Sequence, residues 1–138
     1  MRLAAVTGCR LHLIEPLGFS LDDARLRRAG LDYRDKAIVA VHESLDVWRA
    51  ATTPGRVFAL TVDAETVYSD VQFAVGDTFL FGRESVGLPE DVKEASWVTR
   101  CLRLPMVEGV RSINLSNAAA IVVYEAWRQQ NFRGALQY

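Results

Sequence analysis

The sequence lacks the features that would place it at once in a broad class. No segment approaches the ~20 consecutive apolar residues of a membrane-spanning helix, which excludes a helical membrane protein. There is no linker, repeat or low-complexity tract, so the 138 residues predict a single domain, 1–138, with enough apolar side chains for a core. The net charge is −1, so bulk composition gives no sign of a nucleic-acid-binding protein, although a local basic face is compatible with it.

Cysteine and histidine are also scarce, which limits metal and redox chemistry. Cys9 and Cys101 lie in apolar runs without metal-ligand spacing, and the chain shows no secretion signal. We therefore expect two buried free thiols, no metal site and a soluble cytoplasmic protein. His12 and His42 lie in or beside predicted strands, and the sequence assigns them no role.

The sequence does contain short apolar runs that alternate with helical patterns. The runs predict five strands, at residues 11–15, 37–41, 56–61, 78–82 and 98–104. Helices are predicted at residues 24–29, from about Leu45 with Ser44 as its cap, from Pro89, and over a closing segment with the apolar stripe Leu115, Ala119, Val122, Val123, Ala126 and Trp127. Strands that are apolar on both faces and alternate with helices predict an α/β fold with a parallel, doubly wound sheet.

The beginning of the chain is unusual for such a fold. Residues 2–8 have the pattern of the last turns of a helix that ends at Gly8. A helix that leads into a parallel strand is normally preceded by a strand, so about fifteen to twenty residues of strand, loop and first turn are expected ahead of Arg2. Either the start codon is an internal Met, or the chain is a shortened one.

Three stretches fall where a parallel sheet binds its ligand, at the carboxyl ends of strands. Residues 82–88 leave a strand, turn on two glycines and enter a helix; the spacing differs from a P-loop or a dinucleotide fingerprint, and a purely structural turn is the alternative. Residues 102–106 end in Met106, which could line an adenine pocket or simply fill the core. Residues 112–117 carry four small polar side chains, more than helix capping requires.

These stretches resemble the cofactor motifs of a known family. Residues 82–88 and 112–118 are similar to motifs two and three of the SPOUT methyltransferases. Residues 14–19, 27–33 and 124–129 resemble the short branch of that family whose known members methylate the wobble ribose of leucine tRNAs, at cytidine or a modified uridine. The resemblance spans nearly the whole chain. It implies 2'-O-methylation of nucleotide 34 of tRNA with S-adenosylmethionine as cofactor, and a C-terminal trefoil knot that composition and periodicity do not show.

The resemblance also implies which residues form the site. Its cofactor contacts correspond to Leu60, Gly82, Leu104, Met106, Ser112, Leu115 and Asn117. Motif one contributes an arginine that matches Arg2, while its asparagine would fall in the segment expected ahead of the chain. Arg83 departs from the family, which has a small residue or Pro there. Both departures bear on activity more than on fold.

Methyl transfer needs the ribose 2'-oxygen aligned with the methyl group and relieved of its proton. The family implies catalytic roles for Arg2 and Ser112. A guanidinium has a pKa above about 12, so we expect Arg2 to orient the ribose and stabilise negative charge, and the proton acceptor is left open. Without the resemblance, Arg2 would be a cation that stabilises a helix C-terminus.

The expected partners are tRNA and a second copy of the chain. Arg25, Arg27 and Arg28 are candidate phosphate contacts, although such charge runs usually form a solvated face. Members of this size act as homodimers, which fits a closing helix with a broad apolar face. Three other functions stay open: a methyltransferase for another tRNA or rRNA ribose, a cofactor- or RNA-binding protein without catalysis, and a flavodoxin-like binding domain, which would leave residues 112–117 unexplained.

Overall fold

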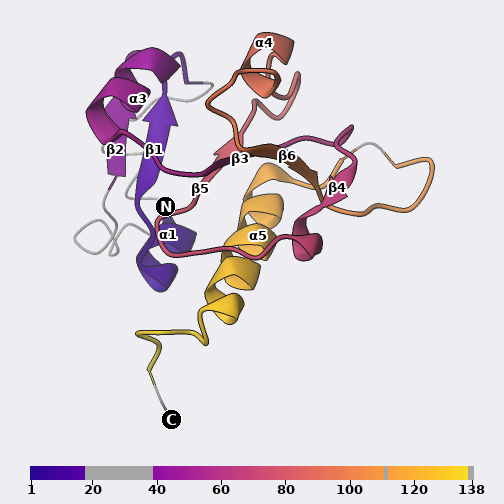
Figure 1. Cartoon of the computed structure of the whole chain (residues 1–138). Coiled ribbons are helices and arrows are strands. Elements are labelled where there is room, and N and C mark those ends of the chain that lie inside the picture. The colour runs from indigo at the N-terminus through magenta and orange to yellow at the C-terminus, as the bar shows by residue number, and fades with distance from the viewer. Residues whose placement is uncertain (18–38, 111, 137–138) are drawn as a thin grey trace. The chain divides into compact units, whose positions relative to one another are not determined.

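The structure, a computed structural model, describes residues 1–17, 39–110 and 112–136, and it divides the chain into two compact units (Figure 1). The first unit comprises Met1–Thr53 and the second Pro54–Tyr138. The helix predicted at residues 24–29 lies outside the described residues.

The first unit contains a pair of parallel strands with a helix against them. Helix α1 (Arg2–Thr7) ends at Gly8, whose φ of 71° is the left-handed conformation that glycine adopts most readily, as the sequence predicted. Strands β1 (Leu11–Ile14) and β2 (Val39–His42) pair in parallel, and α3 (Leu45–Thr52) packs against both. The predicted cap of α3 is confirmed, because the Ser44 hydroxyl accepts a hydrogen bond from the Val47 N–H at 3.2 Å.

The second unit is built on a four-stranded parallel sheet. Its strands are β3 (Val57–Leu60), β4 (Thr66–Val67), β5 (Thr78–Phe81) and β6 (Arg100–Arg103), in the order β4-β6-β3-β5. All three pairings in this sheet are parallel, so the predicted α/β class with parallel strands is confirmed. The parallel register places the carboxyl ends of β3, β5 and β6 side by side.

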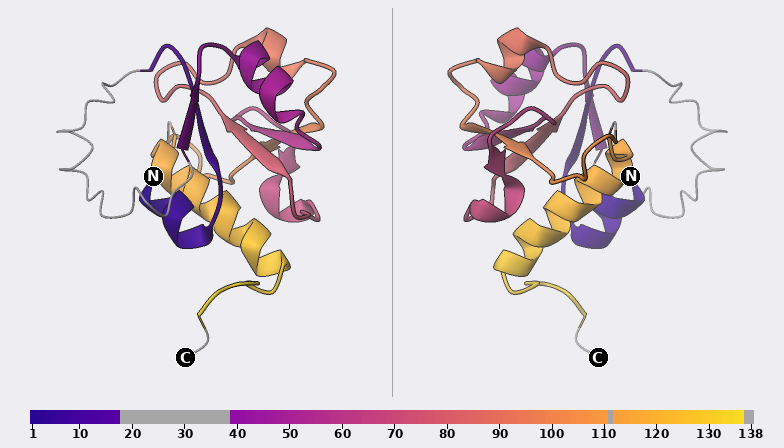
Figure 2. Two further views of the ribbon diagram at one scale, coloured as in Figure 1. Left: turned by 90° about the vertical axis from the view of Figure 1, so that its left-hand side faces the viewer. Right: turned by 90° about the vertical axis from the view of Figure 1, so that its right-hand side faces the viewer.

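One long helix covers a face of this sheet (Figure 2). Helix α5 (Leu115–Gln129) buries Ala118 and Val122, and its Ala126 packs on the core of the unit. That core is centred on Phe58, which makes an edge-to-face contact with Phe73 at 5.4 Å between ring centroids. Aromatic pairs in this geometry stabilise a core beyond the area that they bury.

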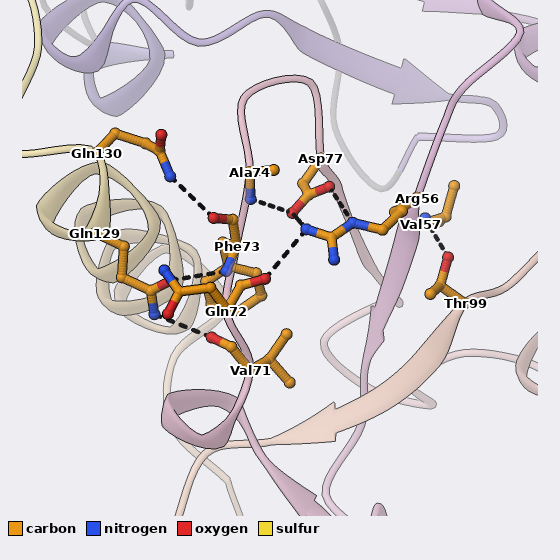
Figure 3. A network of polar contacts seen from close by, with 10 residues as sticks. All are labelled: Arg56, Val57, Val71, Gln72, Phe73, Ala74, Asp77, Thr99, Gln129 and Gln130. Atoms are coloured by element: carbon orange, nitrogen blue, oxygen red, sulfur yellow. Dashed lines mark hydrogen bonds and ion pairs between the residues drawn. The ribbon is translucent and has the colours of Figure 1, made fainter.

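Two glutamines at the end of α5 hold the segment that leads into β5 (Figure 3). The Gln129 side chain accepts from the Phe73 N–H at 2.7 Å and donates to the Val71 carbonyl at 3.0 Å. The Gln130 amide donates to the Phe73 carbonyl at 2.9 Å. The side chains thus satisfy backbone groups around a buried phenylalanine that no strand pairing satisfies.

The same segment is closed by an ion pair that is also drawn in Figure 3. The Arg56 guanidinium donates to both carboxylate oxygens of Asp77, at 2.8 and 2.6 Å, and to the carbonyl of Gln72 at 3.2 Å. Asp77 in turn accepts from the Ala74 N–H at 2.7 Å. These contacts fix the turn immediately before β5, and the loop that follows β5 lines the cavity described below.

The structure corrects several details of the sequence analysis. Strand β4 and the 3-10 turn η2 (Tyr68–Asp70) were not predicted, because two strand residues are too few for a periodic pattern. Pro89 precedes α4 (Glu90–Lys93) as its N-cap and is not the first helical residue. The expectation of buried thiols is wrong for Cys9, which is exposed, while Cys101 is half-buried. No helix among the described residues is long and apolar enough to cross a membrane.

Candidate functional site

The second unit contains a cavity of about 400 Å³ at the carboxyl ends of its strands. Its walls are the segments that leave three neighbouring strands, with the start of α5 and one side chain of α4: residues 60–63, 81–88, Lys93, 102, 104, 106, 112, 113, 115 and 118. Leucines from β3 and β6 supply apolar walls, while the loops contribute charged and hydroxyl groups. A volume of this size suits a small organic ligand, and the carboxyl ends of parallel strands are where such ligands bind.

The loop after β5, residues 82–88, is folded back tightly on itself and is called the glycine loop below. Arg83 and Gly87 exchange two backbone hydrogen bonds, at 3.2 and 2.8 Å, and Gly87 has a φ of 71°. Gly82 lies so close to the backbone of Gly87 and Leu88 that a Cβ atom at position 82 would overlap it. The loop therefore needs glycine at both positions, one for its conformation and one for its close approach.

Asn114 joins this loop to the start of α5. Its side-chain oxygen accepts from the Ser116 N–H at 2.9 Å and from the Asn117 N–H at 3.4 Å, which caps the helix. It also accepts from the Ser116 hydroxyl at 2.6 Å. The Asn114 amide donates to Glu84 at 3.3 Å, so one side chain ties the helix start to the glycine loop.

A second polar cluster lies on the wall formed by β3 and α4. The Lys93 ammonium lies 2.8 Å from a carboxylate oxygen of Asp63 and 2.7 Å from one of Glu90. Asp63 also accepts a short hydrogen bond from the Thr61 hydroxyl. The hydrogen bond from Lys93 is the main cause that lowers the pKa of Asp63 to about 2, with Thr61 the next, and the same contact raises the pKa of Lys93.

The cavity brings together six of the seven residues that the sequence suggested for cofactor binding. Leu60, Gly82, Leu104, Met106, Ser112 and Leu115 all line it, although they are spread over more than fifty positions of the chain. Asn117 is not among its lining residues. It lies exposed in the first turn of α5, where its N–H meets the Asn114 side chain.

The two suggested catalytic residues belong to different units, and the suggested RNA-binding arginines are not described by the structure. Arg2 is exposed and begins α1 in the first unit, whereas Ser112 lines the cavity of the second. No basic residue lies in the last turn of α1, so the alternative reading of Arg2 as a helix C-terminal cation is wrong. Arg25, Arg27 and Arg28 lie outside the described residues.

Sequence reasoning missed three groups at this site. Asn114 was counted only as one of several small polar residues, and its contact with Glu84 was not predicted. The Asp63–Lys93 pair was not considered either, because its members are thirty positions apart. A capping pattern indicates the role of Asn114 at the start of α5, but its contact with Glu84 and the Asp63–Lys93 pair both span thirty positions and have no local signal.

A parallel sheet with a ligand-sized cavity at the carboxyl ends of its strands is the arrangement of an α/β protein that binds a small molecule. The sequence model of the SpoU rRNA Methylase family matches residues 1–124, and the chain belongs to this family. The match covers both units.

Individual relatives are similar over nearly the full chain. A Burkholderia ambifaria protein named tRNA (cytidine(34)-2'-O)-methyltransferase is 53% identical over 97% of this chain and 87% of its own. A solved Bacillus anthracis structure is 45% identical, covers 99% of this chain and 88% of its own, and has a TM-score of 0.89. A structure described as concerning 2-OH methylation of C/U34 on tRNA is 43% identical, with coverages of 96% and 86% and a TM-score of 0.85.

Proposed function

We propose that this protein transfers a methyl group from S-adenosylmethionine to the ribose 2'-hydroxyl of nucleotide 34, a cytidine or modified uridine, in tRNA. The observation that carries the proposal is the 53% identity over 97% of the chain to a protein named for this reaction. The cavity supports it, because six of the seven residues that the family resemblance implies for cofactor binding line it.

The chemistry of the cavity fits this cofactor. Apolar side chains of Leu60 and Leu104 offer a surface for a purine ring, and the loops supply polar groups for a ribose and an amino acid. Asp63 and Glu84 are carboxylates beside a ligand that carries a cationic sulfonium. When bound, the cofactor supplies an activated methyl group.

The protein's own residues have positioning and electrostatic roles in this proposal. Ser112 lies at the cavity with an exposed hydroxyl that can hydrogen-bond the attacking ribose. Arg2 orients the ribose and, as a cation, stabilises the negative charge that develops on the 2'-oxygen. Asn114 keeps the start of α5 and the glycine loop in register, which aligns the reacting groups.

The remaining parts of the proposal concern architecture and partners. We propose one functional domain, residues 1–138, that acts as a cytoplasmic homodimer and has a C-terminal trefoil knot. Arg25, Arg27 and Arg28 would contact tRNA phosphates, with affinity that falls as salt rises. These features follow from the family resemblance.

A second function has a specific observation in its favour. The matching family is named for rRNA methylation, and a shared fold and cofactor site do not fix the RNA target. Transfer of labelled methyl from S-adenosylmethionine to total tRNA and to rRNA, each isolated from cells without the wobble modification, separates the two. Label in tRNA at nucleotide 34 supports the first function, and label confined to rRNA supports the second.

A further inference from the structure

Asp63 and Lys93 form a contact between two segments that line the cavity. Asp63 belongs to the segment after β3, and Lys93 ends α4, which follows the glycine loop. Both line the cavity, and their charged atoms are 2.8 Å apart. The hydrogen bond thus spans thirty positions of sequence and joins the segment after β3 to α4.

Lys93 is anchored more firmly than a surface lysine. Its side chain is only 12% exposed, and its ammonium contacts Glu90 as well as Asp63. Its backbone carbonyl accepts from the Cys101 thiol at 3.6 Å, which connects α4 to β6. Asp63 is held from its other side by Thr61, at the end of β3. Both partners are therefore oriented by neighbours, which reduces the entropy cost that weakens most surface ion pairs.

From this geometry we infer that the Asp63–Lys93 ion pair is a latch that sets the width of the cofactor cavity and thereby the affinity for cofactor. The inference rests on the proposed function, because S-adenosylmethionine is taken as the ligand. Asp63 and Lys93 are positioning residues in this scheme. They act by holding residues 60–63 against α4 and do not act on the reacting atoms.

A latch and a simple charge effect predict different binding patterns. If the pair acts by geometry, losing either partner opens the same contact, so the two losses are equal and do not add. S-adenosylmethionine and S-adenosylhomocysteine share their adenosine and amino-acid groups, so both then bind more weakly in parallel. If only charge matters, removing a negative or a positive group shifts the preference for the cationic sulfonium in opposite directions.

The test is calorimetric titration of the full chain and of Asp63→Asn, Lys93→Met and the double variant with both compounds. We expect each variant to raise both dissociation constants by about two- to fivefold, with no further loss in the double variant. KM for S-adenosylmethionine should rise by the same factor at unchanged kcat. The control is Arg128→Met, which removes an ion pair with Glu125 on α5 away from the cavity and should leave binding unchanged.

The possible results distinguish a failure of the latch from a failure of the cofactor assignment. Unchanged dissociation constants in variants of a chain that binds S-adenosylmethionine would overturn the latch alone. Opposite shifts of the ratio of the two constants in Asp63→Asn and Lys93→Met would overturn it in favour of a charge effect. A wild-type chain that binds neither compound would overturn the cofactor assignment, and the latch with it.

Discussion

The Nδ1 atom of His12 on β1 lies 2.9 Å from the Nε2 atom of His42 on β2, within hydrogen-bond distance. Such a bond needs one ring to donate and the other to accept, so at least one imidazole must be neutral. Burial, then the charges of His42 and Arg10, lower the pKa of His12 below its ordinary 6.5. Trp48 of α3 is an uncharged neighbour of His12, at 6.4 Å between ring centroids. The strand pair of the first unit is therefore sensitive to protonation.

This relationship predicts a loss of stability in mild acid. Below pH 6.5 the unfolded chain binds a proton at His12 that the folded chain does not, so the free energy of unfolding falls as pH falls from 6.5 to the lowered pKa. Urea unfolding across this range should show that slope, and His12→Asn should flatten it. The chain has only two histidines, so NMR titration can follow both rings. A His12 ring that titrates at or above 6.5 would contradict the prediction.

The Asn114 side chain should matter for catalysis beyond its effect on stability. Asn114→Ala removes the cap of α5 and the contact with Glu84, and we expect a loss of about 1 kcal/mol in the free energy of unfolding. The matched control is Ser44→Ala, which removes the cap of α3 in the first unit at a similar cost. Only Asn114→Ala should reduce methyl transfer. Equal activity of the two variants at equal stability would show that the Glu84 contact has no functional role.

Gly82 should tolerate no side chain. Gly82→Ala places a Cβ against the backbone of Gly87 and Leu88, and overpacking of this kind costs about 1–3 kcal/mol. Because the displaced loop lines the cavity, affinity for S-adenosylmethionine should fall at least about tenfold, the equivalent of about 1.4 kcal/mol. Gly55→Ala is the control, since no atom lies within 4 Å of its added Cβ and its φ is not positive. Normal cofactor affinity in Gly82→Ala would show that the loop adapts without cost.

The Gln129 side chain should contribute more to stability than its neighbour Gln130. Gln129→Leu leaves the Phe73 N–H and the Val71 carbonyl without their partner, at a cost of about 1–3 kcal/mol in chemical denaturation. Gln130→Leu removes a single bond to the Phe73 carbonyl, so its cost should be smaller. The reverse order would contradict the prediction and show that the single Gln130 bond contributes more to stability than the two bonds of Gln129.

Features with local causes were predictable from the sequence. The end of α1 at Gly8 and the start of α3 at Ser44 depend on one residue and its immediate neighbours. The parallel strands followed from short apolar runs between helices. The convergence of Leu60, Gly82, Leu104 and Ser112 followed from the rule that ligands bind at the carboxyl ends of parallel strands, together with the family resemblance.

Features that arise only in three dimensions were not predictable. Cys9 lies in an apolar run yet is exposed, because it falls in the turn between α1 and β1. Strand β4 has two residues and gains its identity from pairing with β6. Asp63 and Lys93 look like ordinary surface charges in the sequence, and only the fold shows that they are in contact with each other at the cavity.

The central claim is transfer of a methyl group to the 2'-oxygen of nucleotide 34, and a change of one atom in the RNA tests it most directly. The full chain is incubated with labelled S-adenosylmethionine and either an unmodified leucine tRNA or the same tRNA with 2'-deoxyribose at position 34. We expect label in the first RNA, mapped to nucleotide 34, and none in the second. Equal labelling of both RNAs would contradict it, because the methyl group would then be carried by another atom.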